Sequence, residues 1–124
     1  VKAVLECTKS PGFIRDWEYH KGPQYLGIYE DKEGIVDAIS VTDTETMEHV
    51  DRRHEAYYGV EKIKFNGFIL YRTDLRLAQG FKWGDCKISG KSLDTIRKEL
   101  AAEKQLADEK QKALDESTRV NRKI

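Results

Sequence analysis

Basic and aromatic side chains alternate between residues 62 and 91, and this segment carries the clearest chemistry in the chain. Cations neutralise phosphates and flat rings stack on bases, so the combination is typical of single-stranded nucleic-acid binding. Trp, Tyr and Arg also concentrate binding energy at protein interfaces. A third interpretation is a sheet whose aromatic side chains fill the core while its lysines face water. The candidate partner-binding residues are Lys64, Phe68, Tyr71, Arg72, Arg76, Phe81, Lys82 and Trp83.

No pattern of catalytic or metal-binding residues is recognisable in the sequence. His49 and His54 are five residues apart, whereas the zinc-protease motif needs histidines at i and i+4 with a glutamate between them. Both histidines are therefore expected on a solvated helix face. Asp37 is among the carboxylates that crowd a predicted hairpin, where solvation makes acid–base catalysis unfavourable. Glycine-rich phosphate-binding motifs are also missing, and we expect a protein that is not an enzyme and needs no cofactor or metal.

The composition is that of a folded soluble chain. Two Trp, six Tyr and four Phe supply material for a core, and charged residues make up 35% of the 124 positions. Residues 1–60 hold 7 basic and 12 acidic groups, whereas residues 61–91 hold 7 basic and 3 acidic groups. The net charge of zero argues against a strongly acidic DNA mimic and against a general nucleic-acid binder, which is usually basic.

The sequence predicts a cytoplasmic location. No apolar run approaches the roughly 20 residues that a membrane span needs, and charges at Lys2 and Glu6 interrupt the apolar stretch that a secretory signal would require. Cys7 and Cys86 are the two cysteines. We expect both to be reduced thiols, because disulfides are rare in the cytosol, and we expect Cys7 on the buried face of a strand.

Strands are predicted where apolar and polar residues alternate between turn residues. A polar connection at residues 31–34 forms one hairpin, and Asn66-Gly67 forms a second, because both residues tolerate the positive φ of a type I′ turn. Ser10-Pro11-Gly12 is a further predicted turn, and residues 73–80 are ambiguous between helix and strand. The predicted strands span residues 3–7, 24–30, 35–42, 60–65, 68–72 and 81–88.

Two helices are also predicted. Residues 47–58 are read as a short helix closed by Gly59. Ser92 is the predicted N-cap of a long helix over residues 93 to about 117, which contains the best helix-forming residues and no glycine or proline. The apolar residues expected to dock its first two turns on the domain are Leu93, Ile96 and Leu100. Beyond Ala102 the helix should project into solvent or contact a partner, since it is too polar for a dimeric coiled coil.

The first sixty residues resemble the small SH3-like barrels common among short phage and prophage proteins. The shared pattern is an opening strand that ends in Cys7, then Lys21-Gly22-x-x-Tyr25, Asp31-x-x-Gly34 and Val41-Thr42-Asp43. The chain departs from that pattern at Pro23 and in the helical-looking segment 47–58. Because such folds carry no single function, the resemblance implies only a binding module.

The sequence therefore predicts an α+β fold: five or six mainly antiparallel strands in a small barrel or curled sheet, a short inserted helix and a long C-terminal helix. Residues 1–91 form the predicted compact domain and residues 92–124 the charged helix. The predicted function is that of a non-enzymatic protein-binding module, a phage-type factor that binds and modulates a host protein. The alternative is single-stranded nucleic-acid binding through residues 62–91.

Overall fold

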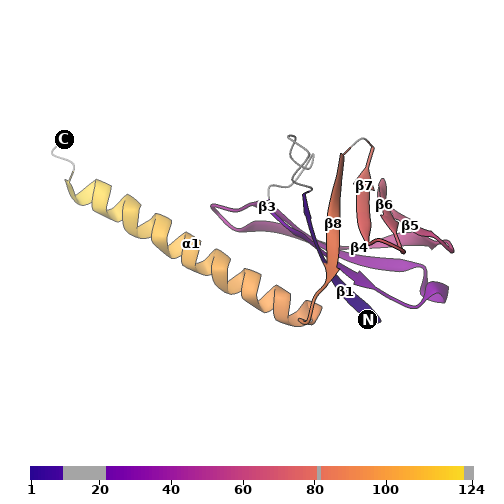
Figure 1. Ribbon diagram of the computed structural model, residues 1–124. Coiled ribbons are helices and arrows are strands. Elements are labelled where there is room, and N and C mark those ends of the chain that lie inside the picture. The colour runs from indigo at the N-terminus through magenta and orange to yellow at the C-terminus, as the bar shows by residue number, and fades with distance from the viewer. Residues whose placement is uncertain (10–21, 81, 122–124) are drawn as a thin grey trace.

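The computed structural model describes residues 1–9, 22–80 and 82–121, in which eight strands precede one long helix (Figure 1). Each strand pairs antiparallel with the next, and β8 also pairs with β1, so the sheet closes into an up-and-down barrel. The strands are β1 Ala3–Lys9, β2 Gln24–Ile28, β3 Ile35–Asp43, β4 Glu48–Tyr58, β5 Lys62–Phe65, β6 Phe68–Tyr71, β7 Arg76–Gln79 and β8 Lys82–Ile88. The predicted turn at residues 10–12 lies outside the described residues. The predicted small antiparallel barrel with a C-terminal helix is confirmed.

Apolar side chains fill the inside of the barrel. They come from alternate positions of the strands, because successive side chains point to opposite faces of a sheet. An eight-stranded barrel is just wide enough for such side chains to fill its interior. The buried residues of this inner core are Leu5, Cys7, Leu26, Val36, Ala38, Ile63, Phe65, Phe68, Leu70 and Leu77.

Both predicted hairpins are confirmed. Phe65 pairs with Phe68 across a two-residue turn, in which Asn66 and Gly67 have φ values of 45° and 80°. Between β2 and β3 the chain makes a single 3₁₀ turn, η1 Asp31–Glu33, and then Gly34 with φ 62°. Positive φ costs glycine little, so these residue types define where the strands reverse.

The predicted helix at residues 47–58 is wrong, because this segment is β4, the longest strand (Glu48–Tyr58). It pairs with β3 over most of its length and with β5 near its end. These two ladders satisfy its backbone hydrogen bonds, and tertiary pairing of this kind overrides a local preference for helix. The ambiguous segment before residue 80 contains β7. With β4 and β7 added, the described barrel has more strands than the five or six predicted.

Helix α1, Leu93–Asn121, packs its first two turns on the outside of the barrel. Ser92 is the N-cap, as predicted, since the backbone N–H of Thr95 donates to its Oγ at 3.2 Å. The predicted docking residues are confirmed: Leu93, Ile96 and Leu100 form an outer core with Val4, Ile39 and Val41. Farther along, α1 leaves the barrel and projects away from it (Figure 1), and Leu106 is 64% exposed.

Gly27 allows this close approach of α1, because a Cβ at that position would overlap the Leu93 side chain. The helix therefore shares an apolar core with the barrel. The predicted division between residues 1–91 and 92–124 separates side chains that pack against each other. Within the described part of the chain, no helix combines the length and apolarity that a membrane crossing requires.

The expected reduced thiols are wrong: Cys7 and Cys86 form a disulfide. The two residues lie opposite each other in the register of β1 and β8, and Cys7 is completely buried. Strand pairing thus brings together two cysteines that are 79 positions apart in the sequence. The bond crosses the seam at which the first and last strands close the barrel.

Candidate binding surface

The outer faces of β5 to β8 differ from the rest of the barrel exterior because α1 does not cover them. The apolar contacts of α1 are with side chains of β1, β2 and β3, and none of the outer-core residues belongs to β5, β6, β7 or β8. Phe65 and Phe68 of these strands lie in the inner core, whereas other aromatic and basic side chains of β5 to β8, among them Lys64 and Trp83, are directed to the surface.

One row of outward-facing residues crosses five strands. Register pairs join Tyr57 to Lys64, Lys64 to Ile69, Ile69 to Ala78, and Ala78 to Trp83. Lys62, Tyr71 and Arg76 lie in the neighbouring row. We call the eight residues of the two rows the outer strip: Tyr57, Lys62, Lys64, Ile69, Tyr71, Arg76, Ala78 and Trp83.

Arg76 organises one end of the outer strip. Its guanidinium carbon lies 4.4 Å from the centroid of the Trp83 ring and 5.7 Å from that of Tyr71. Its Nη2 also donates to Asp74 at 3.3 Å, but its Nε is buried without a hydrogen-bond partner. These contacts hold two rings and a cation at fixed relative positions, and Trp83 remains 38% exposed.

The other end of the outer strip is open. Tyr57 is 68% exposed. A groove of about 650 Å³ lies beside it and is also lined by Lys64 and Ile69. The strip therefore has an exposed ring at each end, half-buried apolar side chains between them, and lysines along one margin.

The structure places the predicted partner-binding residues in three different environments. Lys64, Tyr71, Arg76 and Trp83 come together in the outer strip. Phe68 faces the barrel interior, 7% exposed, and stacks on Phe65 with centroids 5.5 Å apart, so it belongs to the core. The interpretation that aromatic side chains fill the core is thus correct for this pair. Phe81 and the side chain of Lys82 lie outside the described part of the chain.

Arg72 joins two loops and is not part of the outer strip. It donates to both carboxylate oxygens of Asp31, each at 3.2 Å, and to the carbonyl oxygen of Gly59 at 2.8 Å. Tyr57 was missed as a surface residue because a helix was predicted there. The alternation of β4, in which odd-numbered residues face outward, is the signal that identifies it.

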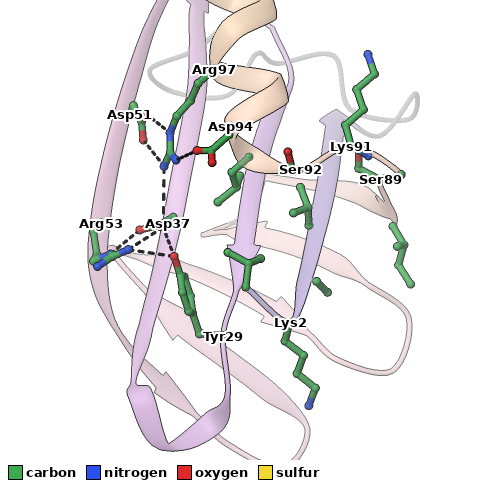
Figure 2. Close-up of a pocket in the computed structure, with 16 residues that line it drawn as sticks. Lys2, Tyr29, Asp37, Asp51, Arg53, Ser89, Lys91, Ser92, Asp94 and Arg97 are labelled. Atoms are coloured by element: carbon green, nitrogen blue, oxygen red, sulfur yellow. Dashed lines mark hydrogen bonds and ion pairs between the residues drawn. The ribbon is translucent and has the colours of Figure 1, made fainter.

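A second cluster of polar residues lies in a groove of about 850 Å³ where α1 begins (Figure 2). Its centre is Asp37, which is 4% exposed and not in a solvated turn as predicted. Arg53 donates to its two carboxylate oxygens at 2.7 and 3.1 Å, and the Tyr29 hydroxyl donates at 2.5 Å. Arg97 of α1 approaches to 4.0 Å and bonds Asp51 at 2.6 Å.

This cluster is a clamp and not a catalytic pair. The hydrogen bond from Arg53 lowers the pKa of Asp37, with burial opposing it, and the hydrogen bond to Asp37 raises the pKa of Tyr29. Asp37 therefore stays ionised and Tyr29 stays protonated at neutral pH, so neither is poised to exchange a proton. The clamp ties β3, β4 and Tyr29, which follows β2, to the first turns of α1.

His54 also differs from its predicted position on a solvated helix face. It lies on the inward face of β4, with its ring centroid 6.1 Å from that of Phe65. Burial lowers its pKa, and the nearby charge of Arg52 lowers it further. Among the residues that the structure describes, no three His, Cys, Asp or Glu side chains are grouped to hold a metal ion.

Comparisons with protein-family models, with curated proteins and with solved structures find no match to this chain. Its surfaces and cavities are therefore the basis for inferring what it does.

Proposed function

We propose that the protein is a non-enzymatic binding module whose outer strip contacts an acidic surface of a protein partner. The observation that carries this proposal is the row from Tyr57 to Trp83, which gathers exposed rings, apolar side chains and a lysine on a face that α1 leaves uncovered. Trp, Tyr and Arg are the residue types that dominate binding energy at protein interfaces.

The charge of the outer strip supports an acidic partner. Lys62, Lys64 and Arg76 contribute three cations; Asp74 pairs with Arg76, and Asp85 lies opposite Arg76 in the register of β7 and β8, so the two lysines of β5 are the charges available to a partner. Ile69 and Ala78 lie between the exposed rings, so a partner would bury apolar surface at the centre and form charge pairs at the margin. This arrangement of an apolar centre within a polar rim is common at protein interfaces.

The disulfide supports action in an oxidising compartment. Bonds such as Cys7–Cys86 persist in secreted, periplasmic and cell-surface proteins and are rare in the cytosol. The cytoplasmic location expected from the sequence is therefore not part of this proposal.

Affinity purification from native extract tests the proposal with two variants of the same charge change. Lys64→Glu alters a lysine of the outer strip, whereas Lys98→Glu alters an exposed position of α1. We expect wild type and Lys98→Glu to capture the same protein in stoichiometric amount, and Lys64→Glu and Tyr57→Ala to lose it. Equal capture by all four proteins would exclude the outer strip as the contact.

Single-stranded nucleic acid is the alternative occupant, since Lys62 and Lys64 project from the same face of β5 beside exposed rings. Fluorescence anisotropy with a labelled single-stranded oligonucleotide at about 50 mM salt distinguishes the two. Two results would show that the partner is nucleic acid and not protein. The first is salt-sensitive oligonucleotide binding that Lys64→Glu abolishes, and the second is loss of the captured partner after nuclease treatment.

A further inference from the structure

One end of the barrel opens into a polar cavity that the outer strip does not use and that shares one residue, Arg53, with the clamp. The cavity has a volume of about 720 Å³, within the range of small-molecule sites. Ala38, Val50 and Phe68 form its apolar part. The polar residues that line this barrel mouth are Gln24, Ser40, Thr42, Arg52, Arg53, His54, Asn66 and Gln79.

Two amide oxygens of the barrel mouth have no hydrogen-bond partner among the residues that the structure describes. Gln24 is 2% exposed, and its Oε1 is buried with no hydrogen bond. The Oε1 of Gln79 is also buried and unpaired. Buried polar atoms are almost always hydrogen-bonded in folded proteins, because an unmade bond leaves the desolvation of the group uncompensated. A ligand with O–H donors would supply the missing bonds.

The charge of the barrel mouth is positive. Arg52 pairs with Ala38 in the register of β3 and β4, which directs it toward the cavity, and it makes no ion pair within the described residues. Arg53 also lines the cavity, but its guanidinium is already bound to Asp37. Of the lining residues that the structure describes, none is Asp or Glu. The unpaired cation therefore favours an anionic ligand.

We propose that the barrel mouth binds a small hydroxycarboxylate, with the carboxylate held by Arg52 and the hydroxyl groups donating to Gln24 and Gln79. A hydroxycarboxylate suits the site better than an amino acid, because an ammonium group would face Arg52 without a carboxylate to pair with it. The apolar side chains of Val50 and Phe68 contact the carbon skeleton of the ligand. This site is separate from the outer strip, since Gln24, Arg52 and Gln79 lie on the inward face of their strands and the residues of the strip lie on the outward face.

Isothermal titration calorimetry with gluconate, glucuronate and citrate tests the proposal, and sorbitol serves as the uncharged analogue of gluconate. We expect saturable binding of at least one of the anions and much weaker binding of sorbitol. Arg52→Gln should weaken binding of the anion at least about tenfold, since hydrogen bonds between charged groups are stronger than those between neutral groups. Lys98→Gln removes a charge of the same sign from an exposed position of α1 and should leave the affinity unchanged.

Gln79→Leu provides a second variant, because it keeps the size of the side chain and removes the acceptor. We expect Gln79→Leu to weaken gluconate binding about tenfold relative to wild type, whereas Lys98→Gln should bind gluconate as wild type does. The ¹H–¹⁵N signals of the His54 ring should shift on titration, which locates the ligand in the barrel mouth. Three results overturn the proposal: no saturable binding of any anion up to about 10 mM, sorbitol binding as tight as gluconate binding, or an equal loss of affinity in Arg52→Gln and Lys98→Gln.

Discussion

Removal of the Cys7–Cys86 disulfide tests how the barrel is closed. The bond joins β1 to β8, where five register pairs hold the two strands together. We expect the double variant Cys7→Ala/Cys86→Ala to fold with a much lower free energy of unfolding. The reason is that the unfolded chain gains the conformational freedom that the cross-link denies it.

The size of this effect follows from the length of the closed loop. The two cysteines are 79 positions apart, and in the chain-entropy description a loop of that size contributes about 4.5 kcal/mol at room temperature. For a small domain that loses about 1.5–2 kcal/mol of stability per molar urea, the unfolding midpoint should fall by roughly 2–3 M.

Urea titrations followed by tryptophan fluorescence measure this shift. Three samples are compared: oxidised wild type, wild type with a reductant, and the double variant. The reduced wild type should have the same urea midpoint as the double variant. The reductant should not change the urea midpoint of the double variant, which has no disulfide to reduce. If thiol titration confirms reduction and the midpoint still moves by less than about 0.5 M, the bond does not constrain the unfolded chain as reasoned here.

Three further outcomes are expected. Ile96→Ala should lower the free energy of unfolding by about 2–4 kcal/mol, because Ile96 is 2% exposed. Leu106→Ala, at an exposed site, should change the free energy of unfolding by less than about 0.5 kcal/mol. Equal losses for the two variants in urea titrations would contradict the docking of α1. Asp37→Asn should cost about 1–3 kcal/mol at neutral pH. The folded pKa of Asp37 lies below its unfolded value, so the ionised group stabilises the fold above about pH 4 and this contribution disappears as the pH falls through the folded pKa; a gap from wild type that does not narrow as the pH falls below about 4 would contradict this. Truncation after Ala101 keeps the buried turns of α1 and should leave the urea midpoint close to wild type, whereas amide exchange in the intact chain should show the distal part of α1 to be less protected than β3.

The elements with strong local signals could be predicted from the sequence. Asn66-Gly67 is a turn because of its own backbone preferences, and the N-cap at Ser92 depends on a hydrogen bond only three residues long. The docking face of α1 was also predictable, since helical spacing alone places Ile96 and Leu100 on one side. Each of these features is decided within a few residues of chain.

The features that were missed depend on partners far away in the sequence. Residues 48–58 form a strand because β3 and β5 pair with it, and the segment itself contains few β-branched residues. The disulfide and the outer strip both require the strand register, which joins Cys7 to Cys86 and Tyr57, through three intervening strands, to Trp83. Asp37 was predicted to lie in a solvated hairpin because its cationic partners, Arg53 and Arg97, come from β4 and α1 and are not recognisable from the local sequence.

The meander order of the strands has a consequence for biosynthesis. As the chain emerges from the ribosome, β1 finds β2 early, but its second edge has no partner until β8 has been made. An unpaired strand edge is a site for association with other chains. The apolar outer side of β3 is likewise bare until Leu93, Ile96 and Leu100 arrive. A nascent chain halted near residue 80 should therefore depend on chaperones far more than the finished protein does.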